Sequence, residues 1–266
     1  MSESARGTPG SGVVILAAAL LLGLTVFITV IRRPATSSNS GPELQSAISN
    51  YVDAVERSPN GVQSAAAGKA IERMKAAGEQ MNGTEAALNA AISRTFERIR
   101  QGNLTYLELV AQATSEQTFD IMKLRHLTDL RQRRQTLTNL IAENRRLSQL
   151  IRDTPGIYEA ELQKAGVKTN FIANALADFN RGFERSSGMM LEIRQTDEDM
   201  VQAALSLLDL LEPRTNDWSF DTNRGQLTVG PVQLRSALNT GLTKIQELNA
   251  RQRQLQQQLD PPPVSQ

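Results

Sequence analysis

The chain has 266 residues, and its 29 lysines and arginines nearly balance its 28 aspartates and glutamates, so net charge gives no general attraction to nucleic acid or acidic substrates. It contains no cysteine, which excludes disulfides, thiol catalysis, cysteine-linked lipids and thiolate metal sites. Aromatic residues make up only 4% of the sequence, a composition that suits a long, thin core better than a large, round one.

The first feature along the chain, after a short tail over residues 1–11, is an apolar segment over residues 12–31 that contains no charge. Twenty helical residues span about 30 Å, the thickness of a bilayer's hydrocarbon core. A cleaved secretory signal is the alternative, but its apolar part is usually about 7–15 residues long and precedes a small-residue cleavage site. This segment instead runs into Arg32 and Arg33. We therefore expect a single-pass transmembrane helix in a bacterial cell membrane, with the side occupied by the remaining chain undecided.

The region after this segment begins with a linker and continues with short helices. Proline, serine, asparagine and glycine dominate residues 32–42, a composition typical of a flexible linker. Apolar periodicity then predicts three short amphipathic helices over residues 43–57, 62–81 and 84–100, separated by turns that contain glycine. Gly102 is interpreted as the stop signal of the third helix.

A long helix is predicted next, over residues 104–151, with a stop at the segment 153–156, which contains proline and glycine. Its apolar stripe changes register midway, which indicates local overwinding or a change of packing partner. Asn144 falls on this stripe. A buried amide there would fix the register of the helices, whereas an asparagine at the solvent edge would not, and the pattern leaves both open.

The most regular feature of the sequence is an apolar ladder between residues 172 and 211, with steps of three and four residues. Such a ladder places one stripe along an α-helix of about 60 Å, where helices pair in coiled coils or bundles. Asp197 lies on the stripe, and a buried carboxylate there needs an arginine, for which we expect residues 131–134. The seam of this helix consists of Ile172, Leu176, Phe179, Phe183, Met190, Ile193, Met200, Leu207 and Leu211.

The period changes to two after Pro213, which is typical of β-strands. With a four-residue loop at 222–225, the apolar side chains of both strands share one face of a β-hairpin near residues 217–230. Because an isolated hairpin is marginally stable, we interpret it as a cap on a bundle end, with a peptide-binding edge as the alternative. The apolar hairpin residues are Trp218, Phe220, Leu227 and Val229.

A second unbroken ladder covers residues 231–259, before a proline-rich tail over residues 260–266 that is predicted to be disordered. Since the hairpin reverses the chain, this last helix should lie antiparallel on the helix before it. The predicted fold is mainly α, an elongated antiparallel helical bundle or coiled coil over residues 43–259, with pairing between chains as the alternative. The seam of the last helix consists of Leu234, Leu238, Ile245, Leu248, Leu255 and Leu259.

Residues suited to catalysis are scarce. His126 is the only histidine, so a histidine-based metal site cannot form within one chain, and a Ser-His-Asp triad would need His126 in a pocket. No phosphate loop, dinucleotide fingerprint or nucleophile elbow is present. Apart from Asp197 on the stripe, the acidic cluster at residues 197–199 is interpreted as a solvated helix face, with a hard-cation site as the alternative if other oxygens converge there. The arginine-rich region 123–152 lacks stacking aromatics and is also interpreted as solvated, with contact to anionic lipid or nucleic acid as the alternative. We expect no enzymatic activity, cofactor, nucleic acid or small-molecule substrate.

The expected function is that of a non-enzymatic, single-pass, membrane-anchored coiled-coil protein that acts as a scaffold or tether through helix–helix contacts. Its expected partners are the bilayer, through residues 12–31, and a partner protein or a second copy of the chain. The alternative is a membrane-anchored sensory or signalling module that transmits binding to the membrane, although the linker at residues 32–42 speaks against stiff coupling. No motif is specific enough to assign a family.

Overall fold

The computed structural model describes residues 62–79, 81 and 83–259, which are nearly all helical and include one small antiparallel sheet of two strands. The mainly helical fold with one hairpin is therefore confirmed. The predicted membrane segment at residues 12–31, the linker, the helix at residues 43–57 and the tail at residues 260–266 lie outside the described residues. Among the described helices, none combines the length and the apolar character that crossing a bilayer requires.

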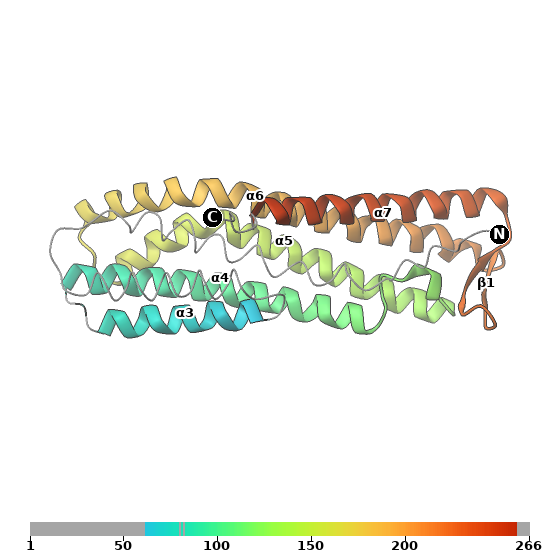
Figure 1. The fold of residues 1–266 in the computed structure, drawn as a ribbon, viewed down its shortest axis with the longest axis horizontal. Helices are drawn as coiled ribbons and strands as arrows, with labels where there is room; N and C mark the ends of the chain where they lie inside the picture. Colours follow the sequence, from blue (N-terminus) through green and yellow to red (C-terminus); the bar gives the residue numbers. More distant parts are fainter. Residues whose placement is uncertain (1–61, 80, 82, 260–266) are drawn as a thin grey trace, which may run out of the picture.

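The described helices lie side by side along one long axis, and the sheet lies at one end (Figure 1). Short connections join them, two of which contain single turns of 3-10 helix. The elements are α3 (Val62–Glu79), α4 (Gly83–Ser115), η1 (Ile121–Lys123), α5 (Leu127–Lys164), α6 (Thr169–Leu211), η2 (Glu212–Arg214), β1 (Trp218–Asp221), β2 (Gln226–Val229) and α7 (Val232–Leu259).

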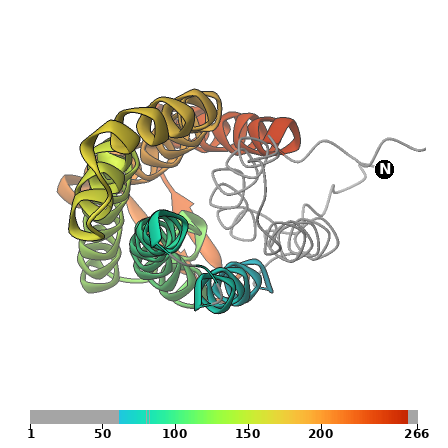
Figure 2. The same cartoon turned by 90° about the vertical axis from the view of Figure 1, so that its left-hand side faces the viewer.

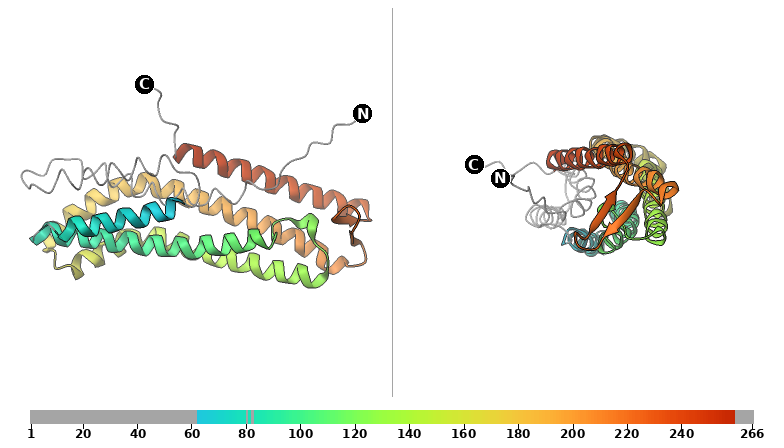
Figure 3. Two further views of the ribbon diagram at one scale, coloured as in Figure 1. Left: turned by 60° about the horizontal axis from the view of Figure 1, so that its bottom comes forward. Right: turned by 90° about the vertical axis from the view of Figure 1, so that its right-hand side faces the viewer.

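Each helix from α4 to α7 packs on the helix that precedes it in the chain, and the α4–α5 and α5–α6 contacts are the most extensive. Seen end on, the helices form a curved layer (Figure 2). The longest, α6, has 43 residues and is therefore about 65 Å long. Two further views show that α7 starts at the hairpin and covers only the C-terminal part of α6, while α3 covers the N-terminal part of α4 (Figure 3). The cross-section of the bundle thus changes near its middle.

Helix α4 passes through Gly102, so the predicted stop at this residue is wrong. A Cβ atom at Gly102 would lie only 2.6 Å from Cδ2 of Leu150 on α5. The glycine therefore allows α4 and α5 to approach each other closely, and it does not end the helix. Glycine serves both purposes in proteins, and the sequence pattern alone does not distinguish them.

The predicted continuous helix over residues 104–151 is also wrong, because the chain leaves the helix after Ser115 and re-enters one at Leu127. Gln117 has a left-handed φ of 55°, and the Thr118 amide donates to the Ala113 carbonyl at 2.8 Å. This is the helix-ending geometry that glycine usually supplies. A glutamine in that place gives no sequence signal, and only the change of register in the apolar stripe indicated the break.

Helix α5 continues through Pro155 to Lys164, whereas a stop was predicted at residues 153–156. Beyond the proline, Tyr158 and Leu162 are buried, and the Tyr158 ring centroid lies 4.6 Å from that of Phe179 on α6. A proline inside a helix removes one backbone donor and costs about 3 kcal/mol. The packing of the last turns of α5 on α6 offsets this cost.

The two strands pair Trp218 with Val229 and Phe220 with Leu227, the register that the sequence pattern predicts. Leu227 is buried and the other three are half-buried. The indole Nε1 of Trp218 donates to the carbonyl oxygen of Leu211 at 3.0 Å, which fastens β1 to the end of α6. Strand β2 lies against η1. The hairpin therefore packs on the end of the bundle.

Candidate functional site

The residues predicted to form the seams of α6 and α7 lie mainly inside the bundle of one chain. In α6 all of them are buried except Leu176 and Met200, which are half-buried. In α7 the burial is less complete, since Ile245 and Leu248 are half-buried. The side chain of Leu259, the last residue of α7, lies outside the described part. The buried α7 seam residues are Leu234, Leu238 and Leu255.

A group of buried polar side chains, which we call the central polar cluster, joins four helices near the C-terminal end of α7. Its ionic part lies on α6, where Arg194 Nη2 is 2.9 Å from Asp197 Oδ2 and each side chain is only 2% exposed. The prediction that Asp197 pairs with an arginine of residues 131–134 is therefore wrong. Its partner lies one turn earlier on its own helix. The members of the cluster are Tyr106, Asn144, Arg194, Asp197 and Gln252.

The other members of the cluster reach Asp197 and Arg194 from neighbouring helices. The Tyr106 hydroxyl of α4 donates to Asp197 Oδ2 at 3.5 Å, and the Tyr106 ring centroid lies 4.9 Å from Arg194 Cζ. From α7, Gln252 Nε2 donates to Asp197 Oδ1. From α5, Asn144 Nδ2 donates to the Arg194 carbonyl at 2.7 Å. Asn144 is thus buried in the seam and does not lie at the solvent edge.

The charge state of the cluster depends on Asp197. Burial raises the pKa of its carboxyl from 3.8 to about 7, and the positive charge of Arg194 opposes this rise. Burial, followed by the negative charge of Asp197, also raises the pKa of Tyr106 well above its usual value, so that the phenol stays protonated. Near neutral pH the cluster is therefore divided between an ion pair and a state with a neutral carboxyl and an unbalanced guanidinium.

This charge state predicts an unusual dependence of stability on pH. Because the pKa of Asp197 is about 7 in the folded chain and close to the ordinary value in the unfolded chain, the folded state binds more protons between these values. The unfolding free energy should be highest near about pH 5 and fall toward about pH 8, by up to about 1 kcal/mol for each pH unit. Urea unfolding across this range measures the slope.

The control for this measurement is Asp197→Asn, which should make the unfolding free energy nearly independent of pH in the same range. Glu97 and Glu161 do not contribute there. Their pKa values are lowered by hydrogen bonds from Arg100 and Lys164 respectively, so they affect stability only under more acidic conditions. An unfolding free energy that rises toward about pH 8 in the native chain would contradict the buried, proton-binding state of Asp197.

The acidic residues next to the cluster do not converge on one point. Glu198 pairs with Arg145 of α5 at 2.6 Å, and Asp199 is exposed and accepts a hydrogen bond from Gln195. Within residues 62–79, 81 and 83–259, no group of three histidine, aspartate or glutamate side chains is placed to hold a metal ion. The chemistry that the central polar cluster can perform is proton binding inside the bundle, because its members are shielded from substrates.

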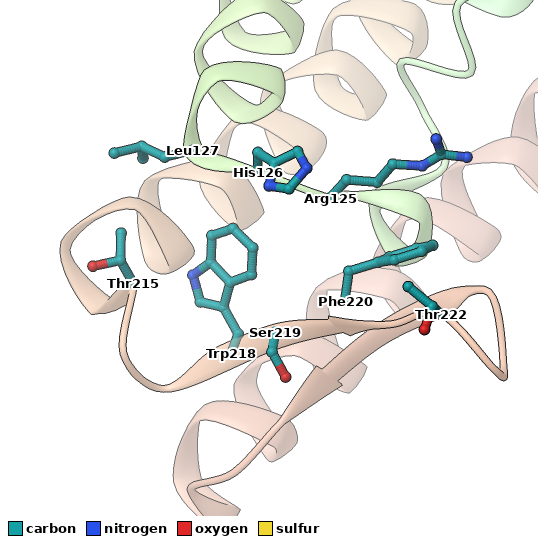
Figure 4. Close-up of a pocket in the computed structure, with 8 residues that line it drawn as sticks. All are labelled: Arg125, His126, Leu127, Thr215, Trp218, Ser219, Phe220 and Thr222. Carbon is teal, nitrogen blue, oxygen red and sulfur yellow. The ribbon is translucent and has the colours of Figure 1, made fainter.

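A second feature is a pocket of about 550 Å³ at the hairpin end, which we call the hairpin pocket (Figure 4). It lies between the segment 125–127, where α5 begins, and the segment around strand β1, which are about 90 residues apart in the sequence. Its lining combines aromatic, basic and hydroxyl side chains and contains no acidic residue. The lining residues are Arg125, His126, Leu127, Thr215, Trp218, Ser219, Phe220 and Thr222.

His126, the only histidine of the chain, lines this pocket. The sequence pattern had predicted that it lies within a long helix. His126 is the residue before α5 and is exposed. Ser219 also lines the pocket, but its hydroxyl points away from the imidazole in Figure 4. Since no aspartate or glutamate lines the pocket, a Ser-His-Asp triad does not form there. The pocket is suited to binding and lacks the groups for acyl transfer.

Arg125 gives this pocket its positive charge. In the sequence it is one of many arginines in the region 123–152, and no pattern distinguishes it from the others. Its Cζ atom lies 5.4 Å from the Phe220 ring centroid, within the range of a cation–π contact. Its backbone amide donates to Asp129 Oδ2 at 3.0 Å. The only signal that could have indicated the pocket is the change of register in the apolar stripe, which marks the break before α5.

Comparisons of this chain with protein-family models, curated proteins and solved structures found no match.

Proposed function

We propose that this chain is a non-enzymatic, single-pass, membrane-anchored scaffold, in which residues 12–31 hold the helical domain at the bilayer and the domain acts through protein contacts. The apolar, uncharged composition of residues 12–31 and the linker composition of residues 32–42 support the anchoring. The observation that carries the scaffold role is the elongated domain, whose longest helix alone has 43 residues. Such a shape extends a partner-binding surface far from its point of attachment.

The anchoring is tested by expressing the full chain and a variant that lacks residues 12–31 in bacteria. The full chain should stay in the membrane pellet after an alkaline carbonate wash, because an apolar helix of this length is held by the hydrophobic effect. The deletion variant should be released. Release of the full chain, or a mature form that mass spectrometry shows to begin beyond residue 31, would favour a peripheral protein or a cleaved signal and would overturn the anchor.

The alternative, a sensory or signalling module, is favoured by the central polar cluster. Asp197 changes charge near neutral pH, and its partners come from α4, α5 and α7. Spin labels on α3 and α7 of the full chain, measured by electron paramagnetic resonance at about pH 6 and about pH 8, separate the two functions. A scaffold keeps the same distance at both pH values, whereas a module that moves its helices on deprotonation changes it.

A further inference from the structure

The hairpin pocket carries an inference that goes beyond the scaffold function and does not depend on a membrane anchor. Trp218 and Phe220 are half-buried and form its apolar wall. The Trp218 indole is held in place because its only donor is used by the Leu211 carbonyl at 3.0 Å. A fixed aromatic surface loses little conformational entropy when a ligand packs on it.

The charge of the pocket is positive and lacks a balancing carboxylate. Within the described part of the chain, the Arg125 guanidinium forms no ion pair and contacts the Phe220 ring. The nearest arginines on α5 differ, since Arg131 and Arg134 pair with Glu212, and Arg133 pairs with Asp129. Arg125 therefore offers its donors to a ligand, and a carboxylate is the group that a guanidinium binds best through paired hydrogen bonds.

Strand β1 adds a second, independent feature. Within the described residues it pairs only with β2, so one of its edges is unpaired. The Gly230 amide donates to the Asp217 carbonyl at 2.9 Å, so Asp217 is a position of β1 that hydrogen-bonds toward β2. The backbone groups of Trp218 and Phe220 then point to the unpaired edge, because paired and unpaired positions alternate along an antiparallel strand. Such an edge can accept an extended peptide as a third strand.

We propose that the hairpin pocket binds an extended acidic peptide of a partner protein, with a peptide carboxylate on Arg125, an apolar side chain on Trp218 and Phe220, and backbone hydrogen bonds to β1. The pocket volume is within the range of sites that bind small ligands or a few peptide side chains. The charge of Arg125 favours an acidic ligand, and the unpaired edge of β1 favours a peptide over a small molecule.

The test uses Trp218 as its reporter, since it is the only tryptophan of the chain and lines the pocket. The full chain in detergent is titrated with the acetylated and amidated peptide Glu-Phe-Glu-Val-Glu, and with Gln-Phe-Gln-Val-Gln as the uncharged control. We expect a saturable change of tryptophan fluorescence with the acidic peptide. Binding should be roughly tenfold weaker or worse with the uncharged peptide, because a charge-assisted hydrogen bond is lost.

The matched variants are Arg125→Gln and Arg224→Gln, both of which remove one exposed guanidinium from the hairpin end. Arg224 lies in the hairpin loop and does not line the pocket. Circular dichroism checks that both variants fold. We expect Arg125→Gln to lose roughly tenfold or more in affinity and Arg224→Gln to bind like the native chain. Equal loss in both variants, or no saturable signal with the acidic peptide, would overturn the proposal.

Two further titrations separate a peptide from a small ligand. The acidic peptide with N-methylated backbone amides should bind more weakly, because it cannot complete the hydrogen bonds to the edge of β1. Benzoate, which carries a carboxylate and a ring but no peptide backbone, should bind far more weakly than the peptide. If benzoate binds as tightly as the peptide, or N-methylation has no effect, the pocket is a small-molecule site and the peptide proposal is wrong.

Discussion

Replacing Arg194 with methionine is expected to lower the unfolding free energy by about 3 kcal/mol at about pH 9, and by less at neutral pH. The guanidinium is the only positive charge in the central polar cluster, and both it and Asp197 are almost fully buried. Without it the pKa of Asp197 rises further, so above about pH 7 the variant must either bury an unbalanced carboxylate or take up a proton on folding, and both cost stability. Urea unfolding followed by circular dichroism measures the effect, which should shrink under acidic conditions, where Asp197 is protonated in the folded chain.

Two further variants distinguish a lost charge partner from lost packing. The double variant Arg194→Met with Asp197→Leu should recover most of the stability, since replacing a buried ion pair by apolar side chains is often neutral or stabilising. Arg145→Met removes an exposed arginine that pairs with Glu198, and should cost no more than about 1 kcal/mol. A double variant as unstable as Arg194→Met alone would mean that the packing of the arginine matters more than its charge.

Truncating Tyr158 to alanine is the second large effect that we expect, a loss of about 3–5 kcal/mol. Its ring is buried on the part of α5 that follows Pro155, and it contacts Phe179 of α6. Without this ring, the packing that offsets the missing backbone donor of the proline is reduced mainly to Leu162, so the last turns of α5 should open more readily from α6. Urea unfolding gives the change in stability, and hydrogen exchange locates it.

The control is Tyr158→Phe, which keeps the ring and should change the unfolding free energy only slightly. In the alanine variant, amide protection should be lost first over residues 155–164. If protection there persists and the loss is spread evenly over the bundle, Tyr158 contributes to the core in general and does not hold this end of α5 in particular.

Much of the architecture could be predicted because it depends on local periodicity. The three- and four-residue steps between Ile172 and Leu211 require a helix with one apolar face. The alternation of apolar and polar residues on both sides of residues 222–225 predicts a hairpin, and the four-residue loop then pairs Trp218 with Val229. In both cases neighbouring residues carry the whole signal.

The errors arose where distant residues decide the local structure. Gly102 stays helical because Leu150 packs beside it, and Pro155 stays helical because Tyr158 is buried on α6. At Gln117 the helix ends without a glycine. At Gly102 and Pro155 tertiary contacts override the ordinary preference of the residue. A sequence pattern contains no information about which contact will be made across helices.

The candidate sites were less predictable than the fold for the same reason. Asp197 could be identified as a polar residue on an apolar stripe, but its partner Arg194 lies off the three- and four-residue ladder. The hairpin pocket requires Arg125 and Phe220 to meet from segments about 90 residues apart. That meeting depends on how the end of α6 and the hairpin return to the start of α5, which only the folded chain determines.

The curved layer of helices, in which α4 to α7 each pack on their predecessor, has a consequence for how the chain folds. Each new contact closes only a short connection, so little chain entropy is lost before the contact forms. Folding can then advance one helical hairpin at a time as the polypeptide is synthesised, without waiting for its C-terminal end. Gln252, close to the end of α7, would complete the hydrogen bonding of Asp197 last.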